Sequence, residues 1–166
     1  MPAIQRITPC LWFDDRAEEA VAFYTAVFRN SRVVGTSRYG EEGREIHGKP
    51  PGSVLMVEFE LDGQAFTALN GGPIYKFTEA ISLQVHCETQ DEVDYYWERL
   101  GQGGDPSAQQ CGWLKDRYGL SWQIVPRVLL EMLSGPVSAA SERVMKALFP
   151  MKKIDVGALE RAFAGR

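Results

Sequence analysis

The segment from Gly112 to Pro126 constrains the fold of this chain more than any other part of the sequence. It contains a short strand, a turn at Asp116–Gly119 and a second strand that stops at a proline, a pattern typical of a β-hairpin. Gly119 can adopt the positive φ angle that such a turn often needs. The sequence therefore predicts two antiparallel strands in this segment.

Gln123 is the polar residue of the second strand and lies between Trp122 and Ile124. Neighbouring side chains of a strand point to opposite faces, so Gln123 points away from the face that buries Trp122. An amide on an interior surface indicates a lined cavity, since a metal or acid–base site usually carries His, Asp or Glu at such a position.

Length and charge exclude several classes of protein. The 166 residues suit one compact unit, and a net charge of −4 without a long basic run disfavours nucleic-acid binding. No apolar signal region begins the chain and no apolar run is long enough to cross a bilayer, so we expect a cytoplasmic protein that does not associate with membranes. Cys10, Cys87 and Cys111 have no metal-ligand spacing and fit reduced thiols.

Hydrophobic periodicity and turn residues predict a mixed chain up to Pro126 and only helices after it. Asp14-Asp15 and Thr89 are expected to cap the first two helices. Outside the hairpin, the strands are expected at residues 7–13, 32–38, 54–61, 64–69 and 81–87, and the helices at 16–28, 90–100, 128–133, 138–149 and 155–164. An exposed loop is expected from Tyr39 to Ser53, and the tail carries enough apolar surface to cover a sheet edge or a neighbouring subunit.

The two halves of the mixed region resemble each other. A shift of ~74 positions places Ile7-Thr8 on Ile81-Ser82 and Trp12 on His86, and a shift of ~56 places residues 63–67 on residues 119–123. Such an order of matches favours a duplication, whose two modules can curve their sheets around a shared cavity. Thr8, Thr67, Ser82 and Gln123 are then expected to face the same space.

Several segments match a known family. They are ITPCLWF (7–13), GSVL (52–55), FELDGQ (59–64), ALNGGP (68–73), CETQDEVD (87–94), CGWL (111–114), WQIVP (122–126) and MKKID (151–155). With these segments the chain resembles the PhnB-like branch of the vicinal oxygen chelate superfamily, which includes glyoxalase, bleomycin-resistance and extradiol dioxygenase proteins. This branch often carries the label 3-demethylubiquinone 3-methyltransferase, but the sequence has nothing like a glycine-rich nucleotide-binding loop for a methyl donor.

The resemblance implies an α+β fold of paired βαβββ modules, and commonly a homodimer. We expect the first module at residues 1–73, the second at 74–126 and the helical tail at 127–166, all within one compact unit. Metal enzymes of the superfamily take His and Glu ligands from the first and last strands of each module. Thr8, Thr67, Ser82 and Gln123 occupy these positions here, and neutral hydroxyls and amides bind divalent metals weakly. We therefore expect no metal and no cofactor.

The repeat and the resemblance together define a candidate set of ligand-binding residues. They are Thr8, Cys10, Trp12, Thr67, Leu69, Ser82, Gln84, His86 and Gln123. His86 is either a general base or hydrogen-bond donor, or a half-buried histidine satisfied by a neighbour. His47 is either part of a lid over an anionic ligand or a solvated loop histidine. Asp116 is either a site carboxylate or, as hairpin chemistry favours, part of the turn.

Aromatic residues and thiols leave further alternatives open. Trp12, Trp113 and Tyr118 form either an aromatic wall for a flat or apolar ligand or ordinary core packing. Cys10 has no evident cationic or histidine neighbour, which favours an inert thiol over a nucleophile.

Three functional hypotheses follow. The leading one is a metal-independent small-molecule-binding protein with the vicinal oxygen chelate fold. The second is a metal-dependent lyase or dioxygenase that uses His86 with other ligands. The third is a structural or regulatory homodimer in which the helical tail forms the interface.

Overall fold

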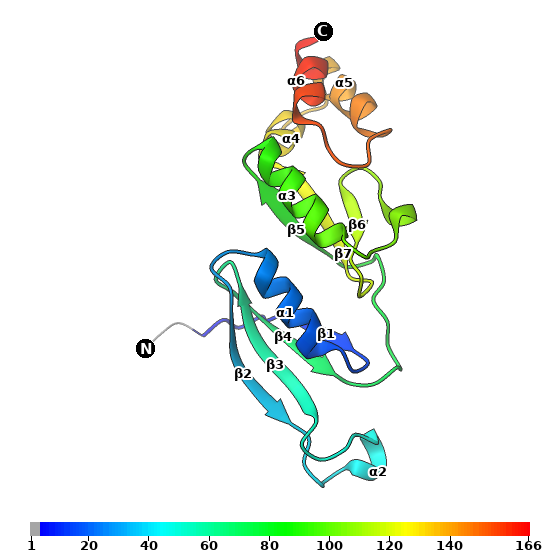
Figure 1. The fold of residues 1–166 in the computed structure, drawn as a ribbon. Helices are drawn as coiled ribbons and strands as arrows, with labels where there is room; N and C mark the ends of the chain where they lie inside the picture. The colour runs from blue at the N-terminus through cyan, green and yellow to red at the C-terminus, as the bar shows by residue number, and fades with distance from the viewer. Residues whose placement is uncertain (1–3) are drawn as a thin grey trace. The chain divides into compact units, whose positions relative to one another are not determined.

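A computed structural model describes residues 4–166 and places the strands in two sheets (Figure 1). The first three residues of the predicted first module lie outside the described range. Contacts divide the chain into two units, one that ends at Lys76 and one that runs from Phe77 to Arg166. Each unit contains one of the sheets, with a helix packed on one of its faces (Figure 1). Among the described residues, no helix is long and apolar enough to cross a membrane.

The first unit follows the βαβββ order that the resemblance implies. Its elements are β1 (Cys10–Phe13), α1 (Ala17–Val27), β2 (Arg32–Arg38), α2 (Arg44–His47), β3 (Val54–Leu61) and β4 (Gln64–Asn70). The strand order is β1-β4-β3-β2, with β1 and β4 parallel and the other neighbours antiparallel. Alternate residues of β3 and β4, such as Phe59 and Ala68, are buried on the side of α1, so the opposite face carries the more exposed side chains.

The predicted start of β1 at residue 7 is wrong, because the strand begins at Cys10. Pro9 lacks a backbone N–H to donate to a sheet ladder, although its carbonyl accepts a hydrogen bond from the Thr67 N–H at 2.9 Å. Thr8 therefore lies outside the strand, and its exposed hydroxyl is 3.4 Å from Gln5 Nε2.

The predicted cap of α1 by Asp14-Asp15 is also wrong. Arg16 occupies the cap position and makes no capping hydrogen bond through its side chain. The buried side chain of Asn70, at the end of β4, supplies the acceptor instead: Ala17 N–H donates to Asn70 Oδ1 at 2.8 Å. A tertiary contact therefore satisfies one of the free N–H groups at the start of this helix.

The loop between β2 and β3 matches its prediction except for one short helix, α2. Tyr39 and Ser53 close its base, with Tyr39 N–H donating to Ser53 O at 2.9 Å and Gly52 N–H donating to Tyr39 O at 2.8 Å. The two hydrogen bonds extend the pairing of β2 and β3 and hold the loop at that end of the sheet.

The second unit carries three strands among the residues that the structure describes. Its elements are β5 (Ser82–Cys87), α3 (Gln90–Gly101), the short 3₁₀ helix η1 (Pro106–Ala108), β6 (Trp113–Lys115) and β7 (Ser121–Pro126). The order is β5-β7-β6, with β5 and β7 parallel and β6 antiparallel to β7. The predicted cap of α3 is confirmed, since Thr89 Oγ1 accepts a hydrogen bond from Glu92 N–H at 3.2 Å.

A fourth strand of the second module is absent from the described residues. The chain between α3 and β6 instead forms a loop that contains η1 and, before it, the adjacent glycines Gly103 and Gly104. A Cβ at Gly104 would lie 2.0 Å from the Lys115 carbonyl oxygen, so the loop passes directly against β6. The glycines and Pro106 are poor residues for a strand and allow this close passage.

The predicted helical tail is confirmed as α4 (Arg127–Leu133), α5 (Ala139–Leu148) and α6 (Val156–Ala164). Its apolar side chains form one cluster with the end of β7, made by Val125, Leu129, Val144, Leu148, Ile154 and Leu159. Backbone hydrogen bonds from Cys111 N–H to Met151 O and from Gly112 N–H to Lys152 O, at 2.8 and 2.7 Å, fasten the tail to the final hairpin. The tail is therefore part of the core of the second unit.

Candidate functional site

The open face of the first sheet, opposite α1, brings four of the predicted residues together in two rows. Cys10 pairs with Thr67 in one row, and Trp12 pairs with Leu69 in the next. Cys10 is exposed, whereas Thr67, Trp12 and Leu69 are half-buried. The arrangement is a shallow surface with polar groups in one row and apolar groups in the other.

Two further residues of this face lie outside the predicted set. Glu58 and Met56 of β3 extend the rows, since Glu58 pairs with Thr67 and Met56 pairs with Leu69. The signal that could have found them is the Asp62-Gly63 turn, because a tight hairpin fixes which residues of its strands face each other. The face thus carries a carboxylate that the candidate set lacked.

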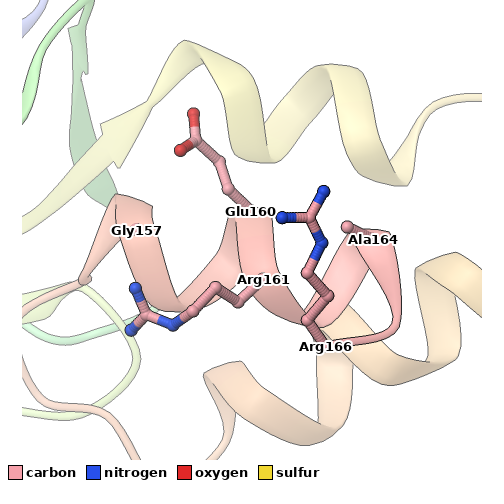
Figure 2. Close-up of a pocket in the computed structure, with 5 residues that line it drawn as sticks. All are labelled: Gly157, Glu160, Arg161, Ala164 and Arg166. Atoms are coloured by element: carbon pink, nitrogen blue, oxygen red, sulfur yellow. The ribbon is translucent and has the colours of Figure 1, made fainter.

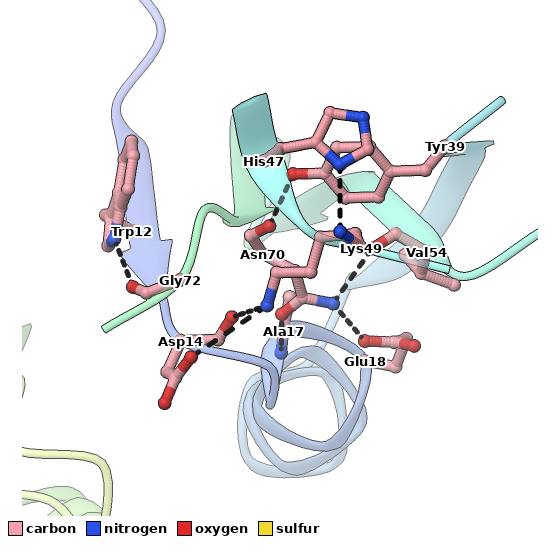
Figure 3. Close-up of polar contacts among 10 residues, drawn as sticks. All are labelled: Trp12, Asp14, Ala17, Glu18, Tyr39, His47, Lys49, Val54, Asn70 and Gly72. Carbon is pink, nitrogen blue, oxygen red and sulfur yellow. Dashed lines mark hydrogen bonds and ion pairs between the residues drawn. The ribbon is translucent and has the colours of Figure 1, made fainter. Parts of the chain in front are cut away.

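Trp12 is fixed at the edge of this face by three contacts. Its Nε1–H donates to Gly72 O at 2.9 Å (Figure 3), and its ring meets that of Tyr75 edge to face with centroids 5.0 Å apart. A Cβ at Gly71 would lie 2.2 Å from Trp12 Cζ2, so glycine is required beneath the ring. These contacts hold the indole in one orientation while leaving it half-buried on the open face.

Asn70 joins the loop, the helix and the sheet of the first unit (Figure 3). Its Nδ2 donates to Glu18 Oε2 at 2.7 Å and to Val54 O at 3.1 Å, while its backbone carbonyl accepts from Tyr39 OH at 2.7 Å. The side chain is 5% exposed and all its hydrogen-bonding groups serve the fold. This arrangement gives Asn70 a structural role.

His47 and Lys49 pack the 39–53 loop onto the same end of the sheet (Figure 3). The imidazole of His47 lies 4.4 Å from the ring of Tyr39 and accepts a hydrogen bond at Nδ1 from Lys49 N–H at 2.9 Å. Lys49 Nζ donates to the Asp14 carbonyl at 2.9 Å. Both nitrogens of His47 face backbone groups, with Nε2 3.2 Å from Glu42 O. The half-buried histidine thus organises the loop itself.

The open face of the second sheet carries a chain of hydrogen bonds between predicted residues. Gln123 Nε2 donates to Ser82 Oγ at 2.8 Å, and Gln84 Nε2 lies 3.4 Å from Gln123 Oε1. Gln84 and His86 are exposed, whereas Ser82 and Gln123 are half-buried. The predicted orientation of Gln123 is confirmed, because Trp122 is 2% exposed on the opposite, helix-covered face.

Strand pairing adds three residues to this face that the candidate set did not include. Trp113 pairs with Gln123, and Lys115 pairs with Ser121, which in turn pairs with Ser82. Lys115 forms an ion pair with Glu79, and Ser121 Oγ is buried without a hydrogen-bond partner among residues 4–166. Buried hydroxyls normally have a hydrogen-bond partner, so Ser121 is an exception within the described part of the chain.

The pairing of the strands supports the internal repeat. Cys10 pairs with Thr67 in the first sheet, and their equivalents Gln84 and Gln123 pair in the second. The next pair along, Trp12 and Leu69, corresponds to His86 and Val125. Val125 belongs to the apolar cluster of the helical tail and is buried, whereas its equivalent in the first unit, Leu69, is half-buried.

Asp116 stabilises the hairpin turn, as the turn interpretation predicts. Oδ1 accepts hydrogen bonds from Tyr118 N–H at 2.8 Å and Leu120 N–H at 3.1 Å, and Oδ2 accepts from Trp122 Nε1–H at 2.8 Å. The side chain is 2% exposed, and Gly119 has φ +84°. The carboxylate is saturated by the fold and is not directed at a ligand.

The three cysteines differ in environment but none is positioned as an activated nucleophile. Burial, with a smaller effect of the Glu92 charge, raises the pKa of the Cys87 thiol to about 12, so it stays protonated at neutral pH. Cys111 lies within 3.6 Å of the carbonyls of Leu148 and Phe149, where it packs against the tail. Cys10 is exposed and free.

The donor set does not fit the metal centre of the superfamily. Thr67, Ser82 and Gln123 offer a hydroxyl, a hydroxyl and an amide, and Thr8 lies outside the first strand. Gln123 and Ser82 are, moreover, hydrogen-bonded to each other. Within residues 4–166, no three His, Cys, Asp or Glu side chains lie together in a group able to hold a metal ion.

A depression lies along α6 (Figure 2). Its volume is about 260 Å³, and its lining is Gly157, Glu160, Arg161, Ala164 and Arg166. The charged side chains that line it are all exposed and come from one helix and the residues after it. It contains none of the candidate residues.

Comparisons with known proteins place this geometry in context. The model of the family described as 3-demethylubiquinone-9 3-methyltransferase matches residues 5–125. The PhnB protein from Bacillus cereus, named provisionally as such a methyltransferase, is 39% identical with a TM-score of 0.62, covering 74% of this chain and 99% of its own. Comparison with curated proteins gives no match.

Two more distant structures share the fold alone. Protein PA1353 from Pseudomonas aeruginosa is 17% identical with a TM-score of 0.56, over 75% of this chain and 98% of its own. The fosfomycin resistance protein FosX from Listeria monocytogenes is 18% identical with a TM-score of 0.54, over 80% of this chain and 100% of its own.

Proposed function

This chain belongs to the 3-demethylubiquinone-9 3-methyltransferase (PhnB-like) family, within the vicinal oxygen chelate superfamily, and we propose that it binds a small organic molecule without a catalytic metal. The observation that carries the proposal is the hydrogen-bonded chain of Ser82, Gln123 and Gln84 on the open face of the second sheet. By the resemblance, neutral donors and acceptors occupy the positions from which metal enzymes of the superfamily take their ligands. They suit recognition of polar groups on a ligand by hydrogen bonds.

The residues at both ends of this chain, Ser82 and Gln84, can form further hydrogen bonds. With the amides oriented as observed, the Ser82 hydroxyl hydrogen and the Gln84 amide oxygen remain available to a ligand. The Lys115 ammonium, which pairs with Glu79, and the buried Ser121 hydroxyl lie in the same row as Ser82. The ligand we propose therefore carries both a hydrogen-bond donor and an acceptor, while Trp113 offers apolar area beside them.

The corresponding pair in the first sheet, Cys10 and Thr67, has the same place in its strands. We propose that Cys10, Thr67, Trp12 and Leu69 contact ligand in the same manner as Ser82, Gln84, His86 and Gln123. Thr8 lies outside β1 and remains in the proposed set only because of the resemblance to the family. Methyl transfer is not part of the proposal, since the family name describes relatives and no glycine-rich loop for a methyl donor is present in the sequence.

A fragment screen by two-dimensional NMR of ¹⁵N-labelled protein in the presence of a chelator tests this proposal. Fragments with a paired donor and acceptor are expected to shift the Gln123 and Gln84 side-chain amide signals, and Gln123→Ala should abolish their binding. Gln64→Ala, which alters an exposed glutamine of β4, is the matched control and should leave binding unchanged. Binding that appears only when a divalent metal is restored would show the proposal to be wrong.

We also propose that the protein works as a homodimer, as the resemblance implies, and that it does so in the cytoplasm. Large apolar side chains remain exposed on the helical tail, including Leu130 and Phe163. A monomer in multi-angle light scattering of the intact chain would contradict the dimer.

A further inference from the structure

Glu58 carries a charge that the protein does not neutralise. It is exposed on the open face of the first sheet, and no residue from 4 to 166 forms an ion pair or hydrogen bond with its carboxylate. Glu60, two residues further along β3 on the same face, pairs with Arg32 at 2.8 Å. The hydrogen bond from Arg32 holds the pKa of Glu60 below its usual range. The sheet therefore supplies a cation to one carboxylate and none to the other.

Gly35 explains the difference, because it is the residue of β2 that pairs with Glu58. A Cβ at Gly35 would lie 3.2 Å from Glu58 Oε2, so a larger residue at this position would crowd the carboxylate. The φ angle of Gly35 is outside the left-handed region, so the backbone conformation does not require glycine. The glycine instead provides space for the carboxylate and places no competing side chain beside it.

The surroundings of Glu58 define what kind of group would fit. Thr67 lies across from it on β4, and Cys10 follows on β1. The next row holds Met56, Leu69 and Trp12, which present apolar and aromatic area. Residues two positions apart in a strand are roughly 7 Å apart. The face thus sets a carboxylate beside an apolar strip that ends in an indole.

We infer that this face binds an organic cation, with an ammonium group at Glu58 and an apolar or aromatic body on Met56, Leu69 and Trp12. The inference rests on the proposed small-molecule-binding function and adds the charge class of the ligand. A carboxylate attracts an ammonium group by charge and hydrogen bonding, and an indole face adds to that attraction. A divalent metal ion does not fit, because the described residues bring no group of three His, Cys, Asp or Glu side chains together.

Three probes of similar size test the charge preference: 2-phenylethylammonium, 2-phenylethanol and 3-phenylpropionate. Titration into ¹⁵N-labelled protein is expected to shift the amide signals of Gly35, Glu58 and Thr67 with the ammonium probe most strongly. Glu58→Gln should weaken binding of that probe by about fivefold, the upper range for an exposed ion pair. Gly35→Ala, which displaces the carboxylate but keeps its charge, should weaken it by a smaller factor.

Glu60→Gln is the matched control, since it removes a paired carboxylate from the same strand and face; its affinity for the ammonium probe should equal that of the wild type. Circular dichroism melts of all three variants separate lost binding from lost folding. The inference is overturned if Glu58→Gln binds the ammonium probe as well as the wild type, if the propionate binds as tightly as the ammonium, or if none of the three probes shifts the first sheet. Fragment binding at Gln123 of the second sheet is measured independently, so the proposed function stands or fails separately from this inference.

Discussion

Replacing Asp116 by alanine should destabilise the protein strongly, because the turn residue is buried and fully hydrogen-bonded. Its carboxylate accepts three hydrogen bonds, from Tyr118 N–H, Leu120 N–H and Trp122 Nε1–H, and is 2% exposed. Each buried donor left without its charged acceptor costs about 1–3 kcal/mol, and water entering the vacated space recovers part of this. The expected loss in the free energy of unfolding is about 3–5 kcal/mol.

Asp116→Asn should cost less, about 2 kcal/mol, because the amide keeps one oxygen acceptor but turns an NH₂ group toward another donor. Urea unfolding followed by tryptophan fluorescence and far-UV circular dichroism measures both losses. Asp105→Ala is the control, since Asp105 accepts from Ser107 in an exposed loop and its loss should cost at most about 1 kcal/mol. A loss below about 1 kcal/mol for Asp116→Ala would mean that this buried carboxylate does not stabilise the hairpin.

Three further changes test other parts of the structure. Asn70→Ala removes the cap of α1 and the bond to Val54 O, and should lower the free energy of unfolding in urea by about 2–4 kcal/mol; an unchanged midpoint would contradict this. Gly104→Ala should prevent native packing of the second unit, because a Cβ would lie 2.0 Å from Lys115 O; a native NMR spectrum would contradict it. Since the pKa of Cys87 is raised to about 12 in the folded protein, its contribution to stability is complete below about pH 8.5 and falls as the pH rises from there toward 12. Unfolding free energies at pH 8 and 10 should therefore differ less in Cys87→Ala than in the wild type, whereas Cys10→Ser should behave as the wild type.

Features set by neighbouring residues were predictable from the sequence. The Asp62-Gly63 hairpin, the Asp116 turn and the Thr89 cap all depend on residues within a few positions of each other, and all three are confirmed. The internal repeat also agrees with the strand pairing, since Cys10 pairs with Thr67 in the first sheet and Gln84 pairs with Gln123 in the second. In each sheet, only one register of the parallel strands buries their apolar side chains on the same face.

Features that depend on distant residues were not predictable in the same way. Asn70 caps a helix that begins 53 positions before it in the chain, where the local sequence offered Asp14-Asp15. Pro9 delays the first strand, and the glycines before Pro106 replace an expected strand of the second unit with a loop. Glu58 gives no local signal in the sequence, because its setting depends on Gly35 of the neighbouring strand. The pairing of that strand is irregular on both sides of Gly35.

Calorimetric titration of chelator-treated protein with Zn, Ni, Mn and Fe(II) is the sharpest test of metal-independent binding. Wild type and Gln123→Ala should give the same weak binding of each ion, because the amide of Gln123 is engaged with the Ser82 hydroxyl and neither is a good divalent-metal ligand. Sub-micromolar binding of any of these ions that is lost in Gln123→Ala or Ser82→Ala would contradict a metal-independent binding protein.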